Sequence, residues 1–447
     1  MTFSIDFNWL SSQHEAPEVS QTGATLRIGL DDAVLTRNVD DWSKTVSDDV
    51  RLSAYPLALW FAANWWRLRW ESLASGKPSL SWRMSHELAA AGYGYVWPRV
   101  LFASDGEVIE VWSEPGENSP AAPVTYLTQT HGFVPAGDFE RTVDGFVQSV
   151  LARLDKVELR GTSLHELWNE LRHERDDKDL ATYRRLEAVA GFDPGEGPDD
   201  ILGRLEEFVP AAGAEAVQEI ATLCGSGQST QVLDDVSRLV HEPGLEATPD
   251  DAATRGQDAR RVNPRLPAWV RGKEMALAVR HHLGWNGQPV SNEDLCGLLG
   301  VAPGTAMDTR HGSRAKLALA VRHDRRNLSL HLRPRTEPAR RFELARFLYD
   351  HAVAVDQDRW LPVTGAKTSR QKAQRAFAAE FLCPIESLKD FLDEDYSDDM
   401  IDDAAQHFNV DVQAVRTQLV NNYLLPREFL PGMDRSSVFP YRQDAAA

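Results

Sequence analysis

The stretch that most constrains the fold of this chain is residues 241–264, which carry no apolar periodicity. Their sequence, HEPGLEATPDDAATRGQDARRVNP, is rich in small and charged residues and offers no face that could be buried. The chain of 447 residues is also too long for one compact core. We therefore expect separately packed parts on either side of a linker, which we place at 244–264.

The part before residue 159 combines strand and helix patterns. Residues 24–37 alternate as two short strands around an Asp-Asp turn, and residues 95–114 form a second hairpin with a Ser-Asp-Gly turn. Residues 55–72 have helical apolar spacing and an unusually tryptophan-rich face. A further helix of about sixteen residues is expected from Asp138. These patterns predict an N-terminal α+β domain over residues 1–158.

The remainder is mostly helical. Residues 159–243 read as a helical connector, and residues 265–425 as a second domain made of helices and one β-hairpin within 315–333. The final helical pair, 401–419, has the spacing of a helix-turn-helix, but its many aspartates favour a packing module over DNA reading. Residues 426–447 are expected to be a tail. The fold class predicted is therefore α+β and multidomain.

The composition of the chain indicates which classes of partner and which cellular compartment to expect. The net charge of −19 repels nucleic-acid phosphates on average, so direct nucleic-acid binding is not expected. No apolar run reaches the roughly 18 residues of a transmembrane helix, and the N-terminus is acidic, unlike a secretory signal. The three cysteines form no CxxC pair. A cytoplasmic protein without membrane association is the expectation.

Two stretches carry a resemblance to a known family. The first is RRFELARFLYDHAVAV, residues 340–355, and the second is FAAEFLCP, which ends a later helix. Together with the order of the surrounding elements, they resemble the ImmA/IrrE family of zinc metallo-endopeptidases, over residues 265–425. The matching positions are Arg341, Phe342, Leu344 and Ala345 in the first stretch, and Phe377, Ala378, Ala379, Leu382 and Pro384 in the second. The resemblance implies a zincin-related domain.

The residues that would perform the family's chemistry are replaced. By the resemblance, Arg346 stands in place of the first zinc histidine, Phe347 of the general-base glutamate and Asp350 of the second histidine. Gln371 falls near the third ligand position. A guanidinium cannot bind zinc and a phenyl ring cannot accept a proton. We therefore expect no zinc, and we hypothesise that an Arg346–Asp350 ion pair replaces the metal and links the two helices.

Four further histidines and a tryptophan-rich helix are candidates for a functional role. His351 is one residue out of phase with Asp350, and His86, His165 and His173 have no histidine four residues further on. We expect all four to be structural. The Trp-rich helix offers a possible partner-binding face, since Trp and Arg are favoured at interface hot spots. The residues of that face are Trp65, Trp66, Arg67, Arg69 and Trp70.

These observations lead to one expected function and two alternatives. The expected function is that of a pseudo-peptidase, a non-catalytic regulatory, sensor or scaffold protein that binds a protein partner. By family analogy, the setting is bacterial transcriptional regulation or anti-phage defence. The first alternative is an active metallo-endopeptidase with non-standard ligands that cleaves a repressor-type regulator. The second is an acidic decoy for a DNA-binding protein.

Overall fold

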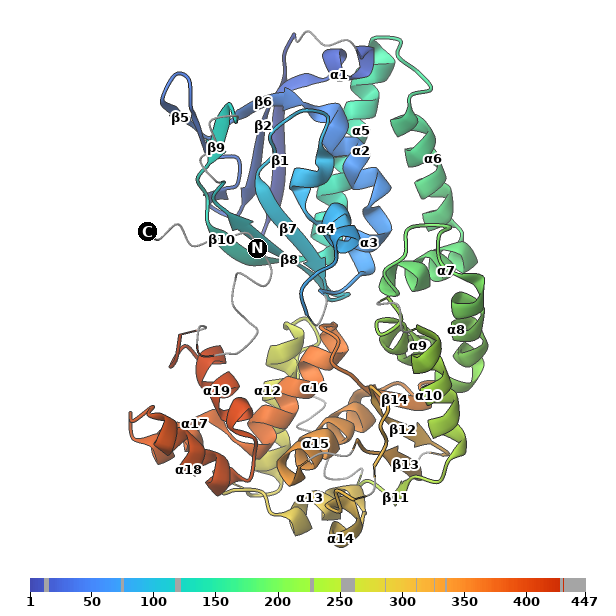
Figure 1. Ribbon diagram of the computed structural model, residues 1–447, viewed down its shortest axis with the longest axis vertical. Coiled ribbons are helices and arrows are strands. Elements are labelled where there is room, and N and C mark those ends of the chain that lie inside the picture. Colours follow the sequence, from blue (N-terminus) through green and yellow to red (C-terminus); the bar gives the residue numbers. More distant parts are fainter. Residues whose placement is uncertain are drawn as a thin grey trace. The chain divides into compact units, whose positions relative to one another are not determined.

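The computed structural model describes residues 1–11, 16–73, 76–116, 122–225, 229–250, 262–285, 287–310, 312–324, 326–333, 336–426 and 429. It divides into two compact units. The first comprises Met1–Leu73 and Pro78–Gly197, and the second comprises Ala74–Lys77 and Pro198–Ala447. Both mix helices with small sheets whose strand ladders are all antiparallel (Figure 1). Within the described residues, no helix is long and apolar enough to cross a membrane.

The first unit contains the expected hairpins and the helices that cover them. Its strands are β1 (Phe3–Trp9), β2 (Gly23–Leu30), β3 (Ala33–Val34), β4 (Asn38–Asp40), β5 (Thr45–Ser47), β6 (Val50–Ser53), β7 (Arg99–Ser104), β8 (Val108–Glu114), β9 (Val124–Tyr126) and β10 (Thr130–Pro135). Its helices are α1 (Pro17–Gln21), α2 (Ala54–Ala63), α3 (Trp65–Trp70), α4 (Leu80–His86), a 3-10 turn (Leu88–Ala91), α5 (Ala136–Lys156), α6 (Ser163–Asp176) and α7 (Lys178–Val189). The β2–β3 and β7–β8 hairpins confirm the two predicted from alternation.

The Trp-rich segment differs from its prediction. It is two helices, α2 and α3, that meet at Asn64, instead of one continuous amphipathic helix. Almost every side chain of α2 is buried, because the helix packs against α5 on one side and α6 on another. The helix expected from Asp138 begins at Ala136 and is 21 residues long.

The second unit holds the domain that carries the resemblance. Its helices are α8 (Asp199–Ala212), α9 (Ala214–Ala221), α10 (Ser229–His241), α12 (Ala268–His282), α13 (Asn292–Leu299), α14 (Pro303–Ala306), α15 (Glu337–Val353), α16 (Ser369–Leu382), α17 (Ile385–Leu392), α18 (Asp398–Phe408) and α19 (Val412–Asn421). Strands β11 (Leu245–Ala247), β12 (Ala318–Arg322), β13 (Leu328–His331) and β14 (Trp360–Val363) form one sheet in the order β11-β13-β12-β14.

The expected connector and linker are corrected by this division. The 159–243 segment is not a body of its own, since α6 and α7 belong to the first unit and α8 to α10 to the second. The beginning of the 244–264 linker is strand β11, which pairs with β13. Strand β11 has three residues, which is too short for an alternation of apolar and polar residues to be recognised in the sequence. Residues 251–261 of the predicted linker lie outside the described residues, as does the 426–447 tail apart from Pro426 and Phe429.

The second unit is organised around a close crossing of α12 and α16, which run side by side in Figure 1. Gly272 makes this approach possible, because a Cβ atom there would overlap the carbonyl oxygen of Ala373. The apolar cluster around the crossing includes Phe377 and Phe381 of α16 and Leu344 of α15.

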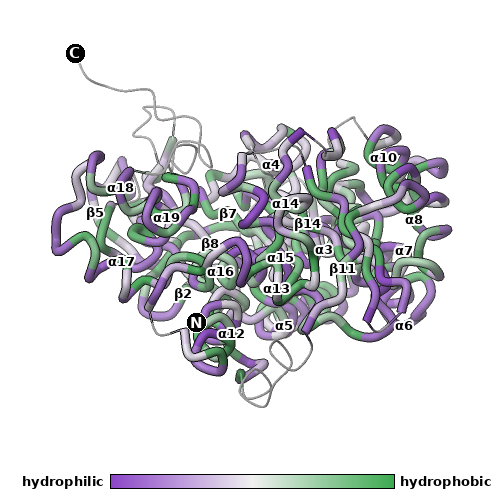
Figure 2. Tube along the Cα trace, turned by 90° about the horizontal axis from the view of Figure 1, so that it is seen from below, coloured by the Kyte–Doolittle hydropathy of each residue, from purple (hydrophilic) through white to green (hydrophobic). Residues whose placement is uncertain are grey.

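The final helical pair belongs to the same core, with Ile401, Phe408, Val415 and Leu419 buried. Its second helix is capped by Asp411, whose side chain accepts a hydrogen bond from the backbone N–H of Gln413 at 2.8 Å. Along α17 and α18, hydrophilic and hydrophobic residues alternate, as expected for helices with one buried face (Figure 2). The pair thus packs as a module of the second unit.

Candidate functional site

Two neighbouring helices, α15 and α16, bring the family-site positions together. Helix α15 begins after Thr336, with Pro338 in its first turn, where a missing N–H costs no hydrogen bond. Helix α16 is capped by Thr368, whose hydroxyl accepts a hydrogen bond from the Gln371 backbone N–H at 3.3 Å. The two helices pack against each other, so side chains from α15 reach the first turns of α16.

Arg341, one of the residues that carry the resemblance, anchors α15 to two segments that are distant in sequence. Its side chain is fully buried. Its Nη2 donates to the carbonyl oxygen of Val290 at 2.5 Å, and its Nε donates to that of Asn409 at 3.0 Å; its Nη1 also contacts Asn292. A guanidinium can serve several carbonyl acceptors at once, which a shorter side chain cannot do. Arg341 therefore has a structural role in holding α15 in place.

Arg346, which the resemblance aligns with the first zinc histidine, connects α15 to α16. Its side chain is 4% exposed. Its Nε donates to Gln374 Oε1 at 3.2 Å, and its Nη2 donates to the carbonyl oxygen of Thr364 at 2.9 Å and to Gln371 Oε1. The family positions 346 and 371 are therefore in direct contact.

The Gln371 carboxamide completes the edge of strand β14 as a neighbouring peptide group would. Its Nε2 donates to the carbonyl oxygen of Pro362 at 2.9 Å, and its Oε1 accepts from the backbone N–H of Thr364 at 2.9 Å. A glutamate at this position could not donate to Pro362 while ionised. The amide is thus matched to the strand edge and to Arg346, and not to a metal.

The hypothesised Arg346–Asp350 ion pair is wrong, because Asp350 pairs with Arg370 instead. Its carboxylate is fully buried, and both oxygens accept from Arg370, Oδ1 from Nε and Oδ2 from Nη2, each at 2.8 Å. The third nitrogen of Arg370 donates to Asp358 at 2.9 Å. Arg346 and Asp350 therefore do not pair with each other in the described residues. Each links α15 to α16 through its own partners, so the proposed link between the helices exists but the proposed pair does not.

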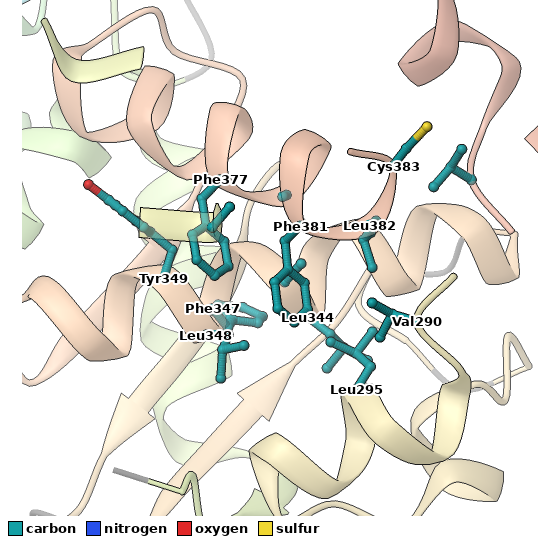
Figure 3. Packing of buried hydrophobic residues seen from close by; sticks show 14 of the residues in the cluster. Val290, Leu295, Leu344, Phe347, Leu348, Tyr349, Phe377, Phe381, Leu382 and Cys383 are labelled. Carbon is teal, nitrogen blue, oxygen red and sulfur yellow. The ribbon is translucent and has the colours of Figure 1, made fainter. Parts of the chain in front are cut away.

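Phe347, which the resemblance aligns with the general-base glutamate, is part of the hydrophobic core. It is 1% exposed and lies among Leu344, Phe377 and Phe381 (Figure 3). Burial of a phenylalanine side chain stabilises a fold by about 1.5–3 kcal/mol. The position therefore serves packing.

Burial and charge set the protonation behaviour of this cluster. Burial alone would lower the pKa of Arg370, but attraction and hydrogen bonding to Asp350 raise it above its ordinary value. Burial lowers the pKa of Arg346 well below its ordinary value, and the nearby Arg375 and Arg333 guanidinium groups lower it further. Because guanidinium groups keep their proton in proteins, Arg346 remains a cation. Its buried charge is stabilised by hydrogen bonds to neutral oxygen atoms of Gln371, Gln374 and Thr364.

The residues present do not fit zinc. Of the four family positions, Asp350 alone has a side chain that commonly binds this metal, and both of its oxygens are engaged by Arg370. Among the described residues, no group of three or more histidine, cysteine, aspartate or glutamate side chains is arranged to hold a metal ion. His351, the out-of-phase histidine, is buried at 1% exposure in α15.

The expected partner-binding face on α3 is also corrected. Trp65, Trp66 and Arg67 are buried, and Arg69 and Trp70 are half-buried. Trp66 Nε1 donates to Glu174 Oε2 at 2.7 Å, and Arg67 Nε donates to Glu71 Oε2 at 2.7 Å.

The cationic side chains of this region also face inward. The Arg69 guanidinium lies over the Trp70 ring at 3.8 Å, with that of Arg185 at 3.7 Å. The rings of Trp65 and Trp66 meet edge to face, with their centroids 4.9 Å apart, and both side chains are buried. The tryptophan-rich face of α3 is therefore part of the hydrophobic core of the first unit.

Of the three histidines that precede a glutamate, His86 and His165 make contacts within the first unit, whereas His173 is exposed on α6. His86 is fully buried, with one ring nitrogen 2.9 Å from Glu71 Oε2 and the other 2.9 Å from the carbonyl oxygen of Phe102. The His165 ring lies 2.8 Å from the Thr162 hydroxyl at the start of α6.

The sequence reading missed Arg370, Asp358, Gln374 and Glu219, which complete the polar cluster. Arg370 directly precedes Gln371, but its partners lie 12 and 20 residues away in sequence, so no local spacing signals the pairing. Glu219 comes from α9, far from the resembling segment, and accepts from the Thr368 hydroxyl at 2.8 Å.

Comparisons with known proteins add no relative: no family model, no curated protein and no solved structure matches this chain.

Proposed function

We propose that this chain is a pseudo-peptidase that binds a protein partner and acts as a regulator, sensor or scaffold. Its second unit would be a relative of the ImmA/IrrE endopeptidases in which the metal site has become a structural brace. By that resemblance, the setting is bacterial transcriptional regulation or anti-phage defence. The proposal rests on the residues at the four family positions and on the contacts they make.

One observation carries the proposal. Positions 346 and 371, which would both face a metal, are in contact through an arginine and an amide. The side chain at position 350 is held by two parallel hydrogen bonds to Arg370. Bidentate arginine–carboxylate bonds are among the stronger polar contacts in proteins. A metal could use Asp350 only after Arg370 released it, which would leave a buried cation without its partner.

The chemistry of the cluster supports binding more than catalysis. Peptide hydrolysis at such a site needs an activated water and a base beside it. The base position is Phe347, and the remaining side chains are cations, amides and carboxylates that satisfy one another. A rigid, hydrogen-bonded centre of this kind would hold the two helices at a fixed angle and so preserve a surface that a partner recognises.

The alternative of a metallo-endopeptidase with non-standard ligands makes an opposite prediction. The purified full chain would then contain stoichiometric zinc, and Asp350→Asn would release it and abolish cleavage of a fluorogenic peptide library. Under our proposal, metal analysis finds zinc well below one equivalent, and library cleavage is the same for wild type, Asp350→Asn and the exposed control Asp390→Asn. Stoichiometric zinc that depends on Asp350 would overturn the pseudo-peptidase proposal.

A further inference from the structure

The hairpin between β4 and β5 carries a tryptophan that the fold does not bury. Trp42 is 99% exposed, and the hairpin projects from the sheets of the first unit (Figure 1). An indole that stays in water removes no apolar surface from it, so Trp42 contributes little to the free energy of folding. The largest apolar side chain type thus stands at a position where only a partner could cover it.

The tip of this hairpin is held in one backbone conformation. The Asp40 carboxylate accepts hydrogen bonds from the backbone N–H groups of Trp42 at 2.9 Å and of Ser43 at 2.8 Å. On the other side of the turn, the Thr125 hydroxyl of β9 donates to Asp41 Oδ2 at 2.8 Å. A loop that is already ordered loses little conformational entropy on binding. The indole is therefore presented by a preorganised support.

An apolar strip continues from the indole along the sheet. Val46 of β5 is 58% exposed and pairs across the sheet with the half-buried Val39 of β4, which in turn pairs with Thr125 of β9. Directly paired residues point to the same face of a sheet, so these side chains form one row. Within the described residues, β5 has no strand neighbour on its outer side. We call Trp42, Val39 and Val46 together the Trp42 surface.

Two carboxylates border the Trp42 surface. The backbone N–H of Ser43, and next that of Trp42, lower the pKa of Asp40 below its ordinary value, so this side chain is ionised at neutral pH. Lys44 Nζ lies 3.5 Å from Asp41 Oδ1, but the lysine side chain is 74% exposed. An ion pair as exposed as this one contributes little and can be exchanged for another cation. The charge at the tip therefore favours a cationic group beside the indole.

We propose that the Trp42 surface binds an extended, arginine-containing segment of a partner protein, with a guanidinium stacked on the Trp42 indole and paired with Asp40 or Asp41. This inference names the partner's chemistry, and its role in regulation rests on the proposed function. Tryptophan is the best aromatic partner of a cation, and the planar guanidinium both stacks on a ring and pairs with a carboxylate. Apolar side chains beside the arginine cover Val39 and Val46. The net charge of −19 attracts such a segment over a longer range.

The same charges disfavour other occupants. A second copy of the chain would bring its own Asp40 and Asp41 against these carboxylates, and like charges that face each other across a strand pair are destabilising. Nucleic-acid phosphates and anionic lipid headgroups are repelled in the same way. The cations Arg27 and Arg37 do not reverse this sign at the tip, since both lie against Asp48.

Fluorine NMR of the full chain labelled with fluorotryptophan tests whether the indole is covered. The probe is the peptide Ser-Val-Arg-Val-Arg-Val-Ser, and the same peptide with glutamine in place of both arginines is the comparison. The Trp42 resonance is the one that Trp42→Ala removes. We expect the arginine peptide to shift this resonance saturably and to bind at least about tenfold more tightly than the glutamine peptide. No saturable shift, or equal binding of the two peptides, would overturn the proposal.

Fluorescence anisotropy of the labelled arginine peptide separates the contributions of the indole and the charge. We expect Trp42→Ala to weaken binding about 30-fold, as at an interface hot spot, without unfolding the chain. Asp40→Asn keeps the side-chain oxygen that accepts the two N–H bonds of the turn, and should weaken binding about fivefold. Asp32→Asn removes an exposed carboxylate from the β2–β3 turn of the same unit and should bind as wild type does. Equal affinities of Asp40→Asn and Asp32→Asn would refute the pairing with a carboxylate.

Two further results distinguish this proposal from its neighbours. Light scattering should find the same mass for wild type and Trp42→Ala. A dimer that Trp42→Ala dissociates would overturn the proposal, because the surface would then belong to a second copy of the chain. Stoichiometric zinc would overturn the proposed function alone, whereas failure of the arginine peptide to bind a zinc-free chain would overturn the Trp42 surface alone.

Discussion

Removing the carboxylate at position 350 should destabilise the second unit more than any change at a surface ion pair. Asp350 is fully buried and Arg370 is 12% exposed, with two hydrogen bonds of 2.8 Å between them. Breaking a buried pair by removing one partner costs about 3–5 kcal/mol, because an uncompensated charge remains. Arg370 keeps Asp358 at 2.9 Å. We therefore expect Asp350→Ala to lower the free energy of unfolding by about 3 kcal/mol, at the lower end of that range.

Urea unfolding followed by circular dichroism measures this change, with the slope of the transition unchanged. Combining Asp350→Ala with Arg370→Met in a double-mutant cycle should give a coupling of about 2 kcal/mol, toward the upper end of the 0.5–3 kcal/mol seen for residues in contact. Asp398→Ala is the matched control, since it breaks the exposed Arg416–Asp398 pair and should change stability little. A loss below about 1 kcal/mol for Asp350→Ala would refute the view that this pair braces the two helices.

Three further outcomes follow from the packing. Gly272→Ala should destabilise by more than 2 kcal/mol in urea unfolding, roughly the cost of overpacking a core, whereas Gly297→Ala in α13, which meets open space, should be neutral or stabilise slightly. Trp66→Ala should cost about 3–5 kcal/mol, while Trp42→Ala, at a residue 99% exposed, should stay within about 0.5 kcal/mol of wild type. Burial raises the pKa of all three cysteine thiols, to about 11 or 12, so a disulfide reagent at pH 8 should react only after denaturation, with Cys224, Cys296 and Cys383.

The sequence predicts local structure well where the period of apolar residues determines it. The hairpins at β2–β3 and β12–β13 follow from the alternation of apolar and polar residues. The prediction of a partner-binding face on the Trp-rich segment is wrong for a physical reason. Helix α3 is packed against its own unit on several sides, so its apolar residues do not fall on a single face. The tryptophans outside the expected face therefore resembled a docking surface, although they are buried in the core.

The pairing of the candidate side chains could not be predicted from the sequence. Spacing within α15 placed Arg346 and Asp350 on one face of the helix, and the structure adds a hydrogen bond from Arg346 to Gln371. That these positions correspond to a metal site stays a prediction. The choice of Arg370 as the partner of Asp350 depends on tertiary packing, since an i, i+4 pair and an interhelical pair compete for the same carboxylate. No pattern in the sequence marks that competition.

The most direct test of the central claim, that a metal site has been replaced by a brace, is to restore the family ligands. Arg346→His, Asp350→His and Gln371→Glu together supply the three protein ligands that zinc needs. Titration with Co²⁺ as a spectroscopic substitute, checked by zinc analysis, should give about one metal ion per restored chain and none bound tightly by wild type. A folded triple variant that binds no more metal than wild type would contradict the claim, because the three positions would then not converge as a metal site requires.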